Sequence, residues 1–224
     1  MKNIQKFGGI AALYMAFAHL TGILIFIVVL DYMNITDLTQ KVAVNVANQA
    51  VVFATNLLMY VFFGFFLIGL SLALYDRLKS GAPALMQIAA AIGIVWAGSL
   101  IASGMVANAG LAAIIPLYAK DPVQASLTWQ SIETVTNGLG NANGEILGGL
   151  MTLLVSLAAL RTGGLPRALS ILGLLVGTVG ILTIIPALNT FVSVFGLGQI
   201  AWFIWLGIVL LRSKPQKTSA TSNA

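Results

Sequence analysis

The sequence is poor in charged residues and contains no cysteine. Only 8% of its 224 residues are Asp, Glu, Lys or Arg, whereas a soluble globular domain usually has about 25%. A soluble fold with so few charges would expose large apolar patches and aggregate. The absence of cysteine excludes disulfides, thiolate metal sites and a cysteine nucleophile. Because 59% of the chain is hydrophobic, its outer surface is expected to face lipid.

Titratable residues are also too few for the common catalytic sites. The chain has one histidine, His19, and six acids, so it lacks the ligands of a zinc site and the two histidines of a bis-histidine haem. No acid lies at the depth of His19 for a triad, and no lysine lies within an apolar run for a retinal Schiff base. The net charge of +5 does not indicate nucleic-acid binding, because the basic residues are scattered between apolar runs. We therefore predict no cofactor, no metal and no nucleic-acid partner.

Six apolar segments are long enough to cross a bilayer. A span needs about 20 residues, at 1.5 Å per residue, to cross roughly 30 Å of hydrocarbon. Gly81 and Pro83 separate the second and third segments, and Gly163, Gly164 and Pro166 separate the fourth and fifth. The sequence thus predicts an all-α bundle of six transmembrane helices, forming one domain over 1–212, with spans at 8–30, 49–75, 84–107, 144–160, 169–188 and 191–211.

Basic residues in the loops predict that both termini are cytoplasmic. With the N-terminus inside, only Lys41 and Lys120 of the 11 basic residues lie outside. The first apolar run is longer than a signal peptide's and has no cleavage site, so we expect it to be retained. Residues 213–224 are expected to form a disordered basic tail. This orientation places two long loops, 31–48 and 108–143, on the outer side.

The second outer loop contains a predicted helix. Asp121 followed by Pro122 is typical of an N-cap and first helical position. Apolar residues then fall approximately on one face, which favours an amphipathic helix at the interface or folded over the bundle. The glycine-rich run 138–144 is expected to break this helix before the fourth span.

Polar residues near the apolar spans are the candidate ligand-lining residues. His19 and Gln199 lie near the predicted midplane, where they could form a polar anchor in a cavity or, more simply, bond to each other. Glu145 could bind a cation, or could stabilise a helix start capped by Asn143. Together with these, the asparagines at the outer helix ends would line an outward-facing polar vestibule: Asn56, Asn141 and Asn143.

Small residues four apart predict close helix packing. These pairs are Gly144 and Gly148, Gly173 and Gly177, and Ser99 and Ser103.

The second half of the chain resembles a known family. The motifs are Glu145-Ile-Leu-Gly-Gly, Arg161-Thr-Gly-Gly-Leu-Pro-Arg167 and Val194-Phe-Gly-Leu-Gly-Gln-Ile-Ala-Trp202. They are similar to a bacterial membrane family known only as domain of unknown function four-three-eight-six (DUF4386). The resemblance covers about 80 residues and implies six helices in a bacterial inner membrane. It implies no reaction, ligand or catalytic residue.

Three functions remain open from the sequence. The favoured hypothesis is a module that binds or transports a small or amphiphilic ligand through the outer vestibule. The alternative is a structural or accessory protein that associates with a partner, or with a second copy, through its helix faces. An intramembrane enzyme is the least favoured, because no acid–base constellation is present.

Overall fold

The computed structural model describes the backbone of residues 2–212 and the side chains of 3–140 and 145–212. All regular structure within those residues is helical. The predicted tail at 213–224 lies outside them, as do the side chains of Asn141, Asn143 and Gly144. The all-α prediction is confirmed.

The described residues contain nine α-helices and five shorter π and 3-10 segments. The α-helices are α1 (Lys2–Leu24), α2 (Leu38–Ala47), α3 (Gln49–Asn56), α4 (Phe63–Leu78), α5 (Pro83–Tyr118), α6 (Pro122–Thr136), α7 (Ala142–Thr162), α8 (Arg167–Leu182) and α9 (Val192–Arg212). The π segments are η1 (Ile25–Val29), η3 (Leu57–Phe62) and η4 (Asn137–Asn141), and the 3-10 segments are η2 (Tyr32–Asn34) and η5 (Pro186–Phe191).

Five of the described helices are long and apolar enough to cross a membrane. They are Asn3–Val29, Gln49–Leu78, Pro83–Tyr118, Pro122–Thr162 and Pro186–Arg212. The predicted fifth span, 169–188, is shorter than expected, because α8 ends at Leu182 after 16 residues. Pro186 follows it, and the residue before a proline is driven out of the helical region. Ile185 accordingly has an extended backbone, with φ −80° and ψ 118°.

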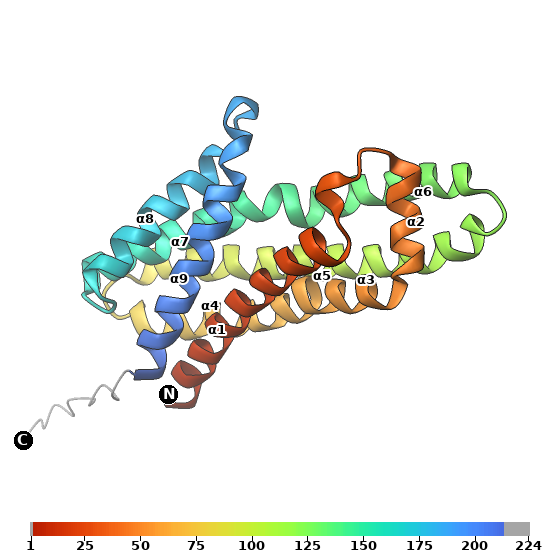
Figure 1. Cartoon of the computed structure of the whole chain (residues 1–224). Coiled ribbons are helices and arrows are strands. Elements are labelled where there is room, and N and C mark those ends of the chain that lie inside the picture. The colour runs from red at the N-terminus through yellow and green to blue at the C-terminus, as the bar shows by residue number, and fades with distance from the viewer. Residues whose placement is uncertain (1, 213–224) are drawn as a thin grey trace, which may run out of the picture.

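The six principal helices form a closed ring. Going around it, α1 packs on α4, α4 on α5, α5 on α7, α7 on α8, α8 on α9, and α9 back on α1. The centre is filled by fully buried apolar side chains that include Met15, Leu67 and Phe203. This packing brings the first and last helices of the chain side by side (Figure 1).

The start of α1 and the end of α9 lie at one end of the ring. Figure 1 shows both of them near the turns that join α4 to α5 and α7 to α8. A hydrogen bond ties these two turns together, since the Arg77 guanidinium Nε donates to the Gly164 carbonyl at 2.8 Å. Gln5 in α1 also donates to the Ala73 carbonyl in α4 at 2.9 Å. We call the opposite end of the molecule the distal end.

A long helical hairpin extends to the distal end. Helix α5 has 36 residues, about 54 Å at 1.5 Å per residue, so it exceeds the roughly 30 Å of a bilayer core. Helix α6 returns alongside it, and α2 lies across the hairpin (Figure 1). A second apolar cluster, including Leu30, Val42, Leu111, Ile114 and Trp129, holds this region together. The distal end therefore has a core of its own.

The helix predicted after Asp121 is present, but it does not break where expected. The Asp121 carboxylate accepts a hydrogen bond from the Gln124 amide at 3.0 Å, as an N-cap does. Residues 138–144 then continue as a π turn and the first turn of α7, so that Pro122–Thr162 runs as one helix. Close packing explains the difference: a Cβ at Gly140 would lie 2.6 Å from the Ser103 hydroxyl of α5. Gly140 therefore allows this segment to pack closely against α5, and it does not form a turn.

Those members of the predicted small-residue pairs whose surroundings the structure describes lie at close contacts between helices. A Cβ at Gly177 in α8 would lie 2.6 Å from the Gly149 carbonyl oxygen and 2.7 Å from the Leu153 amide nitrogen of α7. One at Gly148 would lie 2.8 Å from the Trp96 ring, and Gly173 faces Ser156 and Trp202. Gly173 and Gly177 are buried within the chain, so they are not free to dock a partner.

We predict that Gly177→Ala destabilises the protein by about 1–3 kcal/mol, because backbone atoms of α7 would have to move. The matched control is Gly98→Ala in α5, where a Cβ meets nothing within 4 Å and alanine is the better helix former. Thermal unfolding of both variants in detergent measures the difference. A Gly177→Ala protein as stable as Gly98→Ala would contradict the close α7–α8 contact.

Candidate ligand-binding cavity

A cavity of about 450 Å³ opens at the distal end of the molecule. Its size lies within the 300–1,000 Å³ range of small-molecule sites. Four aromatic rings, two charged groups and several amides and hydroxyls line it. The lining residues are Phe26, Tyr32, Lys41, Val52, Asn56, Met59, Tyr60, Ser103, Ala107, Trp129, Glu133, Thr136 and Asn137.

All three π segments of the described chain border this cavity. Phe26 belongs to η1, Met59 and Tyr60 to η3, and Asn137 to η4. A π turn adds a residue to a helical turn, re-aims the neighbouring side chains, and occurs frequently at functional sites. Three separate helices thus depart from α geometry around the same space.

Helix α5 supplies hydrogen bonds to the backbone at one of these turns. The Ser103 hydroxyl donates to the Thr136 carbonyl at 2.9 Å, and the Ser99 hydroxyl donates to the Leu139 carbonyl. Carbonyls displaced from regular α bonds need other donors when they are buried. The predicted packing pair Ser99 and Ser103 therefore stabilises the widened turn that forms one wall of the cavity.

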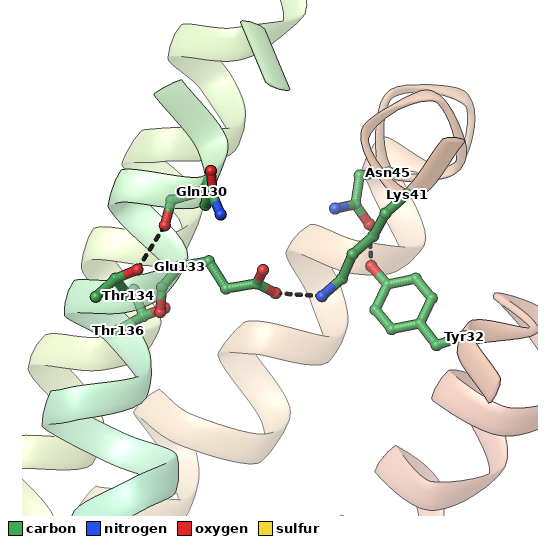
Figure 2. Close-up of polar contacts among 7 residues, drawn as sticks. All are labelled: Tyr32, Lys41, Asn45, Gln130, Glu133, Thr134 and Thr136. Carbon is green, nitrogen blue, oxygen red and sulfur yellow. Dashed lines mark hydrogen bonds and ion pairs between the residues drawn. The ribbon is translucent and has the colours of Figure 1, made fainter. Parts of the chain in front are cut away.

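An ion pair spans the cavity between two distal helices. Figure 2 shows Lys41 from α2 and Glu133 from α6 reaching toward each other, with 2.5 Å between Nζ and Oε1. Their side chains are only 27% and 26% exposed, so water screens them less than the fully exposed pairs that contribute about 0–1 kcal/mol. The pair fixes α2 against α6 across the opening.

Tyr32 lies beside the ion pair and is held by Asn45. The phenol hydroxyl donates to the Asn45 Oδ1, and the Lys41 ammonium lies 5.2 Å from the centre of the Tyr32 ring (Figure 2). Burial raises the pKa of Tyr32, and the Glu133 carboxylate raises it further. Tyr32 therefore stays a neutral hydrogen-bond donor, and its ring face attracts the lysine cation.

A buried pair of asparagines, of which Asn56 lines the cavity, joins α3 to α5. The Asn56 amide donates to the Asn108 Oδ1 at 2.9 Å, and the Asn108 amide donates to the Phe53 carbonyl at 3.3 Å. Both asparagines are more than nine-tenths buried. Asn56 was predicted to line an outer vestibule, and it lines this cavity.

One buried donor in the cavity wall lacks a partner. Trp129 is 6% exposed, and its indole N–H has no hydrogen-bond acceptor in the described residues. Leaving a buried donor without a partner costs about 1–3 kcal/mol. A ligand oxygen in the cavity would satisfy it.

The other candidate residues predicted from the sequence lie elsewhere. The Gln199 amide bonds to the Thr152 hydroxyl of α7 at 3.1 Å, not to His19. His19 lies 3.0 Å from the Met15 carbonyl through Nδ1, and its ring packs edge-on against Phe63. These contacts favour the structural interpretation of both side chains.

Glu145 is half-buried in α7 and does not line the cavity. It lies in the first turn of α7, as the helix-start interpretation expects, although η4 precedes that turn without a break. The side chains of Asn141 and Asn143, which completed the predicted vestibule, lie outside the described residues.

Sequence reasoning missed most of the remaining cavity residues. Lys41 is one of only two basic residues in the predicted outer loops, but this pattern indicated the orientation of the chain and not a binding role. Its partner Glu133 is 92 positions away in the other loop, and no pattern connected the two. No sequence pattern beyond their aromatic character indicated that Trp129 and Tyr32 line a cavity.

Comparison with protein-family models, curated proteins and solved structures finds no match. The similarity of the three motifs to the DUF4386 family stays a prediction. Function must be argued from the cavity itself.

We predict that Tyr32→Phe lowers the free energy of unfolding by about 1–3 kcal/mol, since the fully buried Asn45 would lose the partner of its oxygen. The double variant Tyr32→Phe/Asn45→Leu should lose less than the sum of the single changes, because it removes both polar groups. Chemical denaturation of the four proteins measures this coupling. Additive losses would contradict it.

The same contact predicts a dependence on pH. A folded-state pKa above the unfolded value means that the stabilisation is complete below about pH 10 and is lost as pH rises through the folded pKa. The stability difference between wild type and Tyr32→Phe should therefore shrink above about pH 10. A difference that grows with pH would contradict the neutral, bonded state of Tyr32.

Proposed function

We propose that this protein is a multi-pass protein of a bacterial inner membrane, of the DUF4386 type, that binds an amphiphilic ligand in its outward-facing cavity. The observation that carries the proposal is the convergence of three π turns on one cavity that is lined by an ion pair, by amides and hydroxyls, and by aromatic and apolar side chains. Deviations from regular helix cost stability, and they are kept most often where they shape a site.

The proposed membrane position follows from helix lengths and charges. In our proposal the six ring helices cross the bilayer with both termini in the cytoplasm, and α8 does so by drawing on the residues that flank it. The basic residues of the two short turns, including Arg77, Arg161 and Arg167, support a cytoplasmic location for that end.

This position puts the cavity at the outer boundary of the membrane. About 20 helical residues after Pro83 cross the hydrocarbon, which brings the outer boundary close to Ser103. Lys41 and Glu133 then lie in the headgroup region, whereas Met59, which packs against Gly22 of α1, lies on the side of the ring helices and the acyl chains. A ligand with a polar head and an apolar chain matches this gradient.

Filling the cavity should abolish binding. Ala107 in α5 is 8% exposed and lines the cavity, so Ala107→Trp would occupy the space of a ligand. The matched control is Ala109→Trp, two residues along the same helix on its exposed face. We expect lysophospholipids to raise the thermal midpoint of wild type and Ala109→Trp but not of Ala107→Trp. Equal shifts in all three proteins, or none in wild type, would contradict the proposal.

The proposed orientation can be tested with single cysteines, because the chain contains none. A membrane-impermeant maleimide applied to intact spheroplasts should label Lys120→Cys at the distal tip. It should label Ser80→Cys in the α4–α5 turn only after permeabilisation. The reverse pattern would overturn the orientation.

A further inference from the structure

We infer that the cavity selects a zwitterionic headgroup, one carrying an anionic phosphate or carboxylate and an ammonium, through the Lys41–Glu133 pair. This inference rests on the proposed ligand-binding function and adds the chemical class of the ligand. It follows from charge balance across the cavity and from the polar groups on either side of it.

Each charge of the pair needs a partner. The two side chains are about three-quarters buried and lie 2.5 Å apart. A ligand that enters between them separates them, and a partly buried charge left alone is costly. A purely anionic headgroup would replace Glu133 as the partner of Lys41 but leave Glu133 unpaired. A purely cationic headgroup would do the opposite.

A zwitterion avoids both penalties. Its anionic group replaces the Glu133 carboxylate at Lys41, while its ammonium replaces the Lys41 ammonium at Glu133. The net charge of the site is then unchanged by binding, and every charged group keeps an opposite charge beside it. This exchange needs no conformational change beyond the separation of two flexible side chains.

The surroundings of the pair favour the same headgroup. Trp129, on α6 one turn from Glu133, adds an unpartnered N–H to the lining as a further donor for a phosphate or carboxylate oxygen. The aromatic rings of the lining attract an ammonium through their π faces. The Tyr32 ring has the Lys41 ammonium 5.2 Å from its centre, so a cation is already accommodated there.

The space suits a headgroup with the start of an acyl chain. A volume of 450 Å³ corresponds to about fifteen waters at roughly 30 Å³ each. A whole diacyl lipid would not fit within it, so the rest of the chain would leave along the apolar side toward Met59 and Phe26. Phosphatidylethanolamine-type lipids and soluble zwitterions share the headgroup chemistry, and the experiment below separates them.

The test compares dissociation constants for probes of one chain length. They are lysophosphatidylethanolamine, lysophosphatidylglycerol, dodecylammonium and monoacylglycerol, titrated into the purified full-length protein in detergent. Glycerophosphoethanolamine, which has no chain, tests whether a soluble zwitterion suffices. Wild type should bind the zwitterionic lysolipid about tenfold more tightly than either singly charged probe.

Substitutions of the pair should switch this preference. Glu133→Gln leaves Lys41 as the only charge and should favour the anionic lysolipid by about tenfold over the zwitterionic one. Lys41→Gln should favour dodecylammonium. The controls Lys120→Gln and Asp31→Asn make the same changes in net charge at exposed distal positions and should leave the preference unchanged.

A charge-reversal double variant controls for the possibility that the single variants do not fold. Lys41→Glu combined with Glu133→Lys restores an ion pair and should regain the preference for the zwitterionic probe. Equal affinity of wild type for zwitterionic and anionic probes, or a preference that none of these variants moves, would overturn the inference while leaving the cavity a binding site. Failure of wild type to bind any lysolipid would instead overturn the proposed function.

Discussion

Two helices longer than a bilayer crossing requires govern the architecture of this protein. Helix α5 and the continuous helix through α6, η4 and α7 have 36 and 41 residues, and about 20 suffice for a crossing. The additional residues form the distal hairpin. Helices α2 and η2 cover this hairpin, and a second small apolar core lies between them and it. The cavity lies where this added layer meets the ring of helices. Without the surplus length there would be no wall on which to place Glu133 or Trp129.

Backbone hydrogen bonding sets the second constraint, because polar groups buried away from water must be satisfied within the protein. The hydroxyls of Ser99 and Ser103 supply donors to carbonyls beside η4. Asn108 does the same for the Phe53 carbonyl, just before η3. These three side chains all come from α5, where Ser99 and Ser103 face η4 and Asn108 faces α3, so this helix supports the cavity as well as forming part of its wall.

Much of the architecture was predictable from the sequence, and the site was predictable only in part. Long apolar runs and the Asp121 cap are local features, so the helical class and the start of α6 were correct. Length alone could not show that α8 ends at Leu182 or that the glycines near 140 pack against Ser103, because both depend on what the neighbouring segment does. Asn56 was identified by its position at a helix end. Lys41 and Glu133 were missed because their pairing joins two loops that the sequence treats separately, and Gln199 was paired wrongly because depth does not specify which neighbour it faces.

The π turn at η4 has a consequence for how the two parts of its helix can be oriented. In a regular α-helix each residue advances the rotation by about 100°, so the faces presented by α6 and α7 would be locked in phase over all 41 residues. One extra residue in a single turn resets that phase. Helix α7 can keep Gly149 and Leu153 against α8, while α6 independently turns Glu133 toward Lys41. The packing of the ring and the chemistry of the cavity can therefore change separately, although a single uninterrupted helix carries both.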